Sequence, residues 1–113
     1  MKLNTLALAA AVAIAFAGPV SAGDVASDEA AAMDLLKASK CLTCHSVDKK
    51  KDGPSYASVA EKYRGNPEAE AKLTKWVSEK HPVEIDGEEE VHGMVKTHDP
   101  AKINNLVMWI LSR

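Results

Sequence analysis

Two cysteines and a histidine lie together in the first half of the chain. Cys41 and Cys44 are the only cysteines of the sequence, and His45 directly follows the second. On a helical turn this spacing lets each thiol add to one of the two vinyl groups of a haem. The adjacent imidazole can then bind the iron as its proximal ligand. The C-x-x-C-H pattern therefore predicts one covalently attached haem c, bound through Cys41 and Cys44, with His45 as an iron ligand.

Two other uses of a C-x-x-C pair remain open on the residues alone. A thioredoxin-like redox pair requires a βαβ context, whereas the residues around Cys41 have a helical pattern. A tetrahedral zinc site needs two further ligands, which would have to be carboxylates or His81, His92 or His98. A disulfide between Cys41 and Cys44 would close too short a loop to stabilise the fold. Thioether attachment is the better use of both sulfurs.

The ligand on the other side of the iron decides between electron transfer and ligand chemistry. We predict Met94, which lies in an irregular stretch after Gly93, a residue that lets the backbone approach a porphyrin closely. A thioether ligand raises the reduction potential and closes the iron to oxygen and peroxide. His92, His98 and His81 are the alternatives, since imidazole also binds iron and would give a lower potential.

Residues 1–22 have the pattern of a cleaved signal peptide. Lys2 supplies a positive start, an apolar run extends from Leu6 to Ala17, and small residues occupy the cleavage region Val20-Ser21-Ala22. The apolar run is about 12 residues long, too short for a spanning helix of about 20. We therefore expect an exported, periplasmic protein with one domain over residues 23–113 and no stable membrane insertion.

The composition bounds the class of protein. The chain has 14 basic and 16 acidic residues, a formal net charge of −2, and no dominant basic face, which argues against nucleic acid as a partner. One small domain must form its core with few large side chains. A haem would supply much of the missing apolar area. The aromatic residues after the signal peptide are Tyr56, Tyr63, Trp76 and Trp109.

Four stretches have apolar residues at helical spacing. They begin near Ser27, at Tyr56, at Pro67 and at Asp99, where an N-cap residue precedes Pro100. The third is expected to end near residue 79 or 80. Residues 81–98 have neither a helical nor a strand period, and so long a loop is usually functional. The sequence therefore predicts an all-α domain of four helices with no strand.

In their order along the chain, these motifs resemble small bacterial class I cytochromes c, most closely the c-551 and c-552 type. The resemblance covers essentially all of residues 23–113. It implies a class I cytochrome c fold, with about four helices around one covalently bound haem. The matching segments are Cys41-Leu42-Thr43-Cys44-His45, Asp52-Gly53-Pro54, Met94 and Leu106-Val107-Met108-Trp109-Ile110-Leu111-Ser112.

The resemblance also implies two contacts. Pro54 would pack against His45, and its carbonyl would accept the proximal imidazole proton, which fixes the tautomer and raises the basicity of the ligand. The N-terminal helix would cross the C-terminal helix near Leu36 and Trp109. Both contacts are expectations from the family.

By the same resemblance, the function would be one-electron transfer between periplasmic redox proteins, without catalysis. We expect a monomer or weak complexes, because such encounters have small interfaces. Lys49–Lys51 and the acidic residues between 84 and 90 could steer partners. The alternatives are a haem subunit of a periplasmic dehydrogenase or oxidase complex, and a haem protein with two histidine ligands or an open sixth site.

Overall fold

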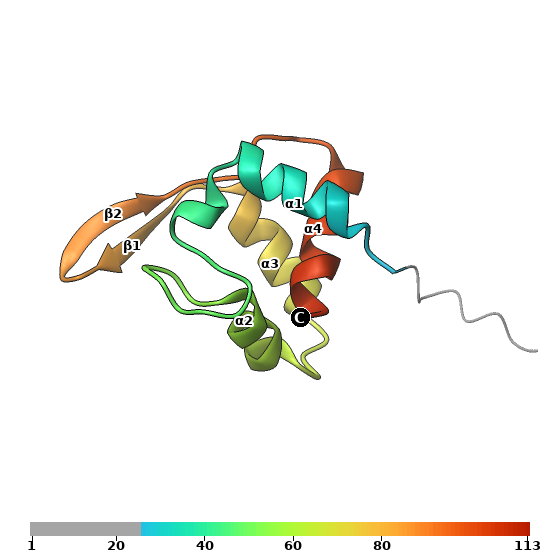
Figure 1. Cartoon of the computed structure of the whole chain (residues 1–113), viewed down its shortest axis with the longest axis horizontal. Coiled ribbons are helices and arrows are strands. Elements are labelled where there is room, and N and C mark those ends of the chain that lie inside the picture. Colours follow the sequence, from blue (N-terminus) through green and yellow to red (C-terminus); the bar gives the residue numbers. More distant parts are fainter. Residues whose placement is uncertain (1–25) are drawn as a thin grey trace, which may run out of the picture.

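The C-terminal helix is the centre of the fold. The computed structural model describes residues 26–113, and the predicted signal peptide lies outside the described residues. Within them, four α-helices form: α1 (Glu29–Ala38), α2 (Tyr56–Tyr63), α3 (Ala69–Ser78) and α4 (Pro100–Leu111). Helix α4 packs against each of the other three, as Figure 1 shows. The predicted arrangement of four helices is confirmed.

Side-chain caps fix where three of the helices begin. The carboxylate of Asp28 accepts a hydrogen bond from the backbone of Ala31 at the start of α1. Asp99 accepts one from Ala101 at the start of α4, where Pro100 takes the first position. The hydroxyl of Ser55 caps α2 in the same way. Each cap satisfies a backbone N–H that the helix itself leaves unpaired.

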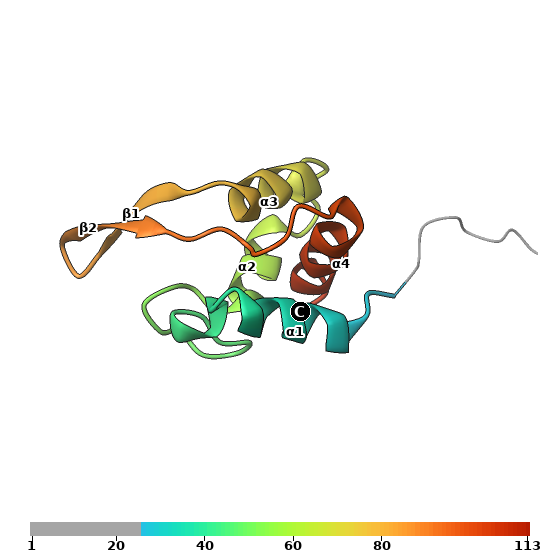
Figure 2. The ribbon, with the colours of Figure 1, turned by 90° about the horizontal axis from the view of Figure 1, so that it is seen from above.

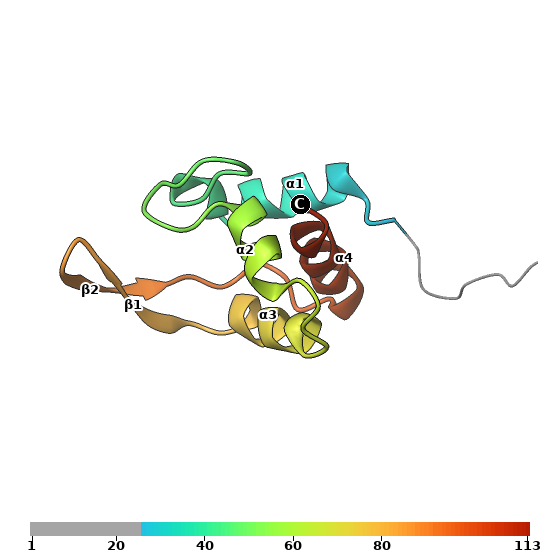
Figure 3. The same cartoon turned by 90° about the horizontal axis from the view of Figure 1, so that it is seen from below.

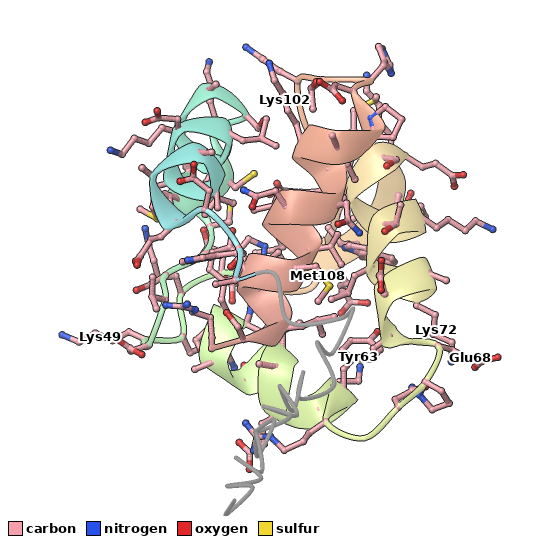
Figure 4. The ribbon with its side chains drawn as sticks, turned by 90° about the vertical axis from the view of Figure 1, so that its right-hand side faces the viewer. Lys49, Tyr63, Glu68, Lys72, Lys102 and Met108 are labelled. Atoms are coloured by element: carbon pink, nitrogen blue, oxygen red, sulfur yellow. The ribbon has the colours of Figure 1, made fainter. Side chains whose placement is uncertain are left out.

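Helix α3 is shorter than the sequence suggested. It begins at Ala69 and ends at Ser78, whereas Pro67 belongs to the preceding turn. The side chain of Asn66 accepts a hydrogen bond from the backbone of Glu68, and this bond holds the turn. Glu68 and Lys72, both labelled in Figure 4, form an ion pair with 3.0 Å between nitrogen and oxygen. Both side chains are exposed, so the pair contributes little to stability.

Helices α1 and α4, which lie near the two ends of the described chain, pack against each other. Leu36 on α1 and Trp109 on α4 are 1% and 0% exposed and belong to one apolar cluster, as the resemblance implied. Asp28 and Asn105 add two reciprocal hydrogen bonds of 2.7 and 2.9 Å between backbone and amide. Buried apolar area and satisfied polar groups thus act together at this crossing.

The long loop predicted after α3 is wrong in part, because it folds into a β-hairpin. Strand β1 (His81–Ile85) pairs antiparallel with β2 (Glu88–His92), and His81 lies opposite His92. Asp86 and Gly87 connect the strands with φ values of 52° and 83°. Two positive φ values are typical of the type I′ turn that the Asp-Gly pair favours. Figures 1 and 2 show the hairpin extending beyond the helices.

The hairpin and the segment that follows α1 lie at the same end of the helical body, as Figures 1 and 3 show. That segment includes a short 3-10 helix, η1 (Cys41–Thr43), and the loop leading to α2. Among residues 26–113, no helix is long and apolar enough to cross a bilayer. The fold is thus mostly helical, with one small two-stranded sheet beside the cysteine motif.

Candidate haem site

The cysteine motif begins in the 3-10 turn η1. The backbone N–H groups of Cys44 and His45 donate to the carbonyl of Cys41 over 3.3 and 3.0 Å. Both cysteines are half-buried free thiols. Burial raises the pKa of the Cys41 thiol, although a hydrogen bond to its own backbone acts in the opposite direction and Cys44 raises the pKa further. The turn geometry agrees with the helical spacing that the motif predicted.

Lys40 redirects the chain from α1 into this turn. Its φ of 59° lies in the left-handed region, directly after Ser39, the C-cap residue of α1. A residue with a side chain costs about 1–2 kcal/mol in this conformation, and glycine is the usual residue there. The entry to the cysteine motif is therefore locally strained at Lys40.

His45 is held in one orientation by the loop that follows it. Its Nδ1 lies 2.7 Å from the carbonyl oxygen of Pro54. Because a carbonyl can only accept, Nδ1 carries the proton and Nε2 is the nitrogen left to bind a metal. A Cβ atom placed on Gly53 would lie 2.8 Å from Nδ1 and 2.9 Å from Nε2, so the ring fits against this position only without a side chain.

Backbone hydrogen bonds tie the same loop to the motif. The N–H of Gly53 donates to the carbonyl of Cys44 over 2.8 Å, and that of Tyr56 donates to Ser46 over 3.0 Å. The ammonium group of Lys51 donates to the carbonyl of Leu42 over 2.8 Å. Lys51 therefore has a structural contact. Lys49, in contrast, points away from the helices in Figure 4.

Met94 lies in a segment that is anchored at two points. Its neighbour Val95 is buried and donates its N–H to the carbonyl of Val77 at the end of α3, over 2.9 Å. The N–H of Lys96 donates to the hydroxyl of Ser39 at the end of α1, over 2.9 Å. Met94 itself is half-buried and lines an open hollow of about 560 Å³. The segment is thus joined to the helix that leads into the cysteine motif.

His92, which was an alternative ligand, lies against His45. The two ring centres are 6.0 Å apart, with the planes at 65°. Nδ1 of His92 donates to the carbonyl of Gly93 over 2.8 Å. Burial lowers the pKa of His92; the Gly93 bond opposes this, and the neighbouring His45 and His81 add to it.

Six rings form a continuous series through the site. Their successive centre-to-centre separations are 5.6, 5.3, 6.0, 5.5 and 4.1 Å. The series begins in the helical core and ends at the base of the hairpin, where one indole is 41% exposed. In order, the rings are Trp109, Tyr56, His45, His92, Trp76 and His81.

These side chains fit a c-type haem. The structure combines two free thiols on one turn, an imidazole with its Nδ1 already engaged, and a glycine where a side chain would displace that ring. Across residues 26–113, no three side chains drawn from His, Cys, Asp and Glu gather into a metal-binding group. The zinc alternative lacks the additional ligands that it needs.

Comparisons with known proteins agree with this assignment. Residues 29–113 match the family model described as Cytochrome c. Among solved structures, the chain is 49% identical to the class 1 cytochrome MtoD of Sideroxydans lithotrophicus ES-1. That similarity has a TM-score of 0.73 and covers 77% of this chain and 97% of that chain.

Curated relatives carry the same family name. The chain is 36% identical over 88 residues to cytochrome c-551 of Allochromatium vinosum, covering 77% of this chain and 90% of that protein. It is also 49% identical over 47 residues to cytochrome c2 of Rhodocyclus tenuis. This second match covers 42% of the chain and about half, 48%, of the relative.

Cytochromes c carry covalently bound haem c and pass electrons to redox partners instead of catalysing a reaction. The match over residues 29–113 extends from the first helix through the cysteine motif to the last residue of the chain. The chain therefore belongs to the cytochrome c family and is an electron-transfer protein with one covalently attached haem c.

Proposed function

We propose that this protein is a periplasmic carrier of single electrons whose iron is bound by His45 and Met94. The observation that supports it most is the bond between His45 and Pro54, which prepares Nε2 for iron next to two free thiols. The periplasmic location follows from the signal-peptide pattern of residues 1–22. The similarity to proteins named cytochrome c-551 adds support for a small electron-carrying cytochrome.

Cys41 and Cys44 would attach the haem through thioether bonds. In each addition a sulfur–carbon bond forms, and the thiol hydrogen goes to the other vinyl carbon, so no oxidant or reductant is required. Both sulfurs belong to one turn whose backbone is closed by hydrogen bonds to Cys41. The haem supplies a one-electron couple, and the protein sets its potential through ligands, burial and hydrogen bonds.

Met94 would complete the ligand set from the opposite side. Its segment is anchored by the hydrogen bonds of Val95 and Lys96, which limits how far the thioether can move. A thioether favours reduced iron and therefore a high potential, and a filled site keeps oxygen and peroxide out. A protein with both axial positions filled by its own side chains is suited to electron transfer.

The surface charges suggest how partners could approach. Strand β2 and its turn have four acidic residues, while Lys49 and Lys50 are exposed in the loop after the cysteine motif. Opposite charges on different parts of a surface can orient a redox partner during diffusion. We propose transient complexes with periplasmic redox proteins, formed by a monomer.

The test is to express the full chain in a host with haem-attachment machinery and to purify the product from the periplasm. We expect a protein that begins after residue 22, retains haem under denaturing conditions and does not bind carbon monoxide when reduced. Its electron exchange with small periplasmic redox proteins should slow as salt increases. Rapid carbon monoxide binding would contradict Met94 ligation, and a colourless product would contradict the haem assignment.

A further inference from the structure

The ring of His92 lies at nearly the distance from His45 that separates two imidazoles bound to one iron. Two axial imidazoles have ring centres about 6.4 Å apart, from metal–nitrogen bonds of about 2.0 Å and about 1.2 Å from each nitrogen to its ring centre. The ring centres of His45 and His92 are 6.0 Å apart. Their planes make an angle of 65°, which axial ligation permits, because each ring can rotate about its own bond to the metal. The observed separation is therefore close to that of a bis-imidazole iron.

The hydrogen bonds of the two rings match. Nδ1 of His45 donates to the carbonyl of Pro54 over 2.7 Å, and Nδ1 of His92 donates to the carbonyl of Gly93 over 2.8 Å. In both rings this leaves Nε2 with its lone pair available. Metal-binding histidines commonly have their other nitrogen bound to a carbonyl or carboxylate in this way. His92 thus has the tautomer of a ligand.

The other two histidines do not share these features. His81 uses its Nε2 to donate to the carbonyl of Trp76 over 3.1 Å, and its ring stacks on the indole with centres 4.1 Å apart. His98 is exposed and lines the hollow that Met94 also lines. His92, in contrast, pairs with His81 across the hairpin and lies at the base of the sheet, with its ring centre 5.5 Å from that of Trp76.

A single exposed glycine separates the two candidate ligands. Gly93 separates His92 from Met94, and a Cβ atom added to it would meet no other atom within 4 Å. Val95 is buried and hydrogen-bonded to Val77, so the chain is held again immediately after Met94. A change confined to residues 92–94 could therefore exchange one ligand for the other while both ends of the segment stay in place.

We propose that His92 is a reserve iron ligand, an inference that rests on the haem and on the His45 and Met94 ligation proposed above. When Met94 leaves the iron, Nε2 of His92 takes its position. One iron–sulfur bond breaks and one iron–nitrogen bond forms, with no proton or electron transferred, because Nε2 already has a free lone pair. The iron is thereby kept six-coordinate and closed to small ligands.

The test compares four holoproteins: the unmodified protein, Met94→Ala, Met94→Ala/His92→Phe, and Met94→Ala/His98→Phe as the matched control. Phenylalanine keeps a ring beside Trp76 but has no nitrogen to bind iron. Electron paramagnetic resonance and optical spectra of the ferric proteins identify the ligands, and carbon monoxide binding to the ferrous proteins measures access to the iron. Thermal unfolding checks that each variant is folded.

Met94→Ala is expected to remain low-spin, with the spectrum of two histidine ligands and slow carbon monoxide binding. Adding His92→Phe should make the iron high-spin and accelerate carbon monoxide binding at least tenfold, whereas adding His98→Phe should change neither. A folded Met94→Ala protein that is already high-spin would overturn the proposal, as would a low-spin state that survives His92→Phe. If instead the unmodified protein already has two histidine ligands and Met94→Ala/His92→Phe loses one of them, the Met94 assignment fails while the ligand role of His92 stands.

Discussion

Nδ1 of His45 and the carbonyl oxygen of Pro54 are 2.7 Å apart, and this bond joins the proximal ligand to a loop nine residues further along the chain. The neighbouring Gly53 lies directly against the ring, and a side chain at this position would overlap it. The ligand orientation therefore depends on two adjacent residues that do not themselves bind iron. Substitutions at Gly53 and Pro54 can therefore test the orientation of His45 without removing an iron ligand.

Replacing Pro54 with alanine should raise the reduction potential. The carbonyl remains, but the backbone loses the ring that fixes its φ angle, so the bond to His45 weakens and the imidazole becomes a poorer donor to ferric iron. A hydrogen bond worth about 1 kcal/mol corresponds to about 40 mV for one electron, which is the upper limit of the expected shift. Protein-film voltammetry measures it. Pro67→Ala, in an exposed turn before α3, should leave the potential unchanged; a lowered potential in Pro54→Ala would contradict this account.

Replacing Gly53 with alanine should disturb the haem itself. The added Cβ would lie 2.8 Å from Nδ1 of His45, so the ring or the loop must move. We expect a loss of about 1–3 kcal/mol in the free energy of unfolding, as for overpacking elsewhere in proteins, together with altered ferric spectra. Gly87→Ala is the control, because its φ of 83° causes only local strain in the hairpin turn. If both variants had unmodified haem spectra, the close fit at Gly53 would not matter for the ligand.

Replacing Lys40 with glycine should stabilise the protein. Lys40 has a φ of 59° between α1 and the cysteine motif, and glycine removes the steric cost of that conformation. The expected gain is about 1 kcal/mol in the free energy of unfolding, measured by guanidinium titration of the holoprotein. Lys37→Gly, within the last turn of α1, should instead destabilise by about 1 kcal/mol. A loss of stability in Lys40→Gly would show that the lysine side chain has a further contact of its own.

Stability should fall in alkali because of Tyr56. Burial raises the pKa of this phenol; a thiolate at Cys41 also raises it, but that effect disappears once the sulfur is a thioether. Because the pKa is raised in the folded state, the contribution of Tyr56 to the free energy of unfolding is fully present below the unfolded pKa of about 10. This contribution is lost as the pH rises above that value. The loss can reach about 1.4 kcal/mol per pH unit.

Tyr56→Phe removes the titrating group while keeping the ring between His45 and Trp109. The free energies of unfolding of the two proteins should therefore change in parallel at neutral pH and diverge in alkali, with the unmodified protein falling more steeply. Chemical unfolding followed by circular dichroism gives both curves. Curves that stay parallel through the ionisation of free tyrosine would show that Tyr56 does not contribute.

Much of the helical fold could be predicted from local sequence. Asp99 caps α4 as predicted, because the effect of a capping residue depends on the backbone only a few positions away. The apolar spacing also placed the start of α2 at Tyr56 and that of α1 within two residues of Glu29. The hairpin was missed because its strands are rich in glutamate, a poor strand former, and include a proline. The sequence feature that indicates this hairpin is its turn, because an Asp-Gly pair such as Asp86-Gly87 favours two positive φ values.

The haem site could likewise be predicted only in part. The cysteine motif was evident because haem attachment requires fixed residue types at a fixed spacing, and the Pro54 contact followed from the family resemblance. The place of His92 could not be predicted, because it depends on strand pairing with His81 and on packing beside Trp76. Such contacts between distant segments leave no periodic pattern in one sequence.

The most direct test of the proposed ligand set is the near-infrared absorption of the ferric holoprotein at neutral pH. Methionine bound to c-type haem iron gives a weak band at about 695 nm. The band should be present in the unmodified protein and in His98→Phe, and absent from Met94→Ala. A low-spin haem without this band would contradict Met94 ligation and with it the proposed high-potential electron carrier.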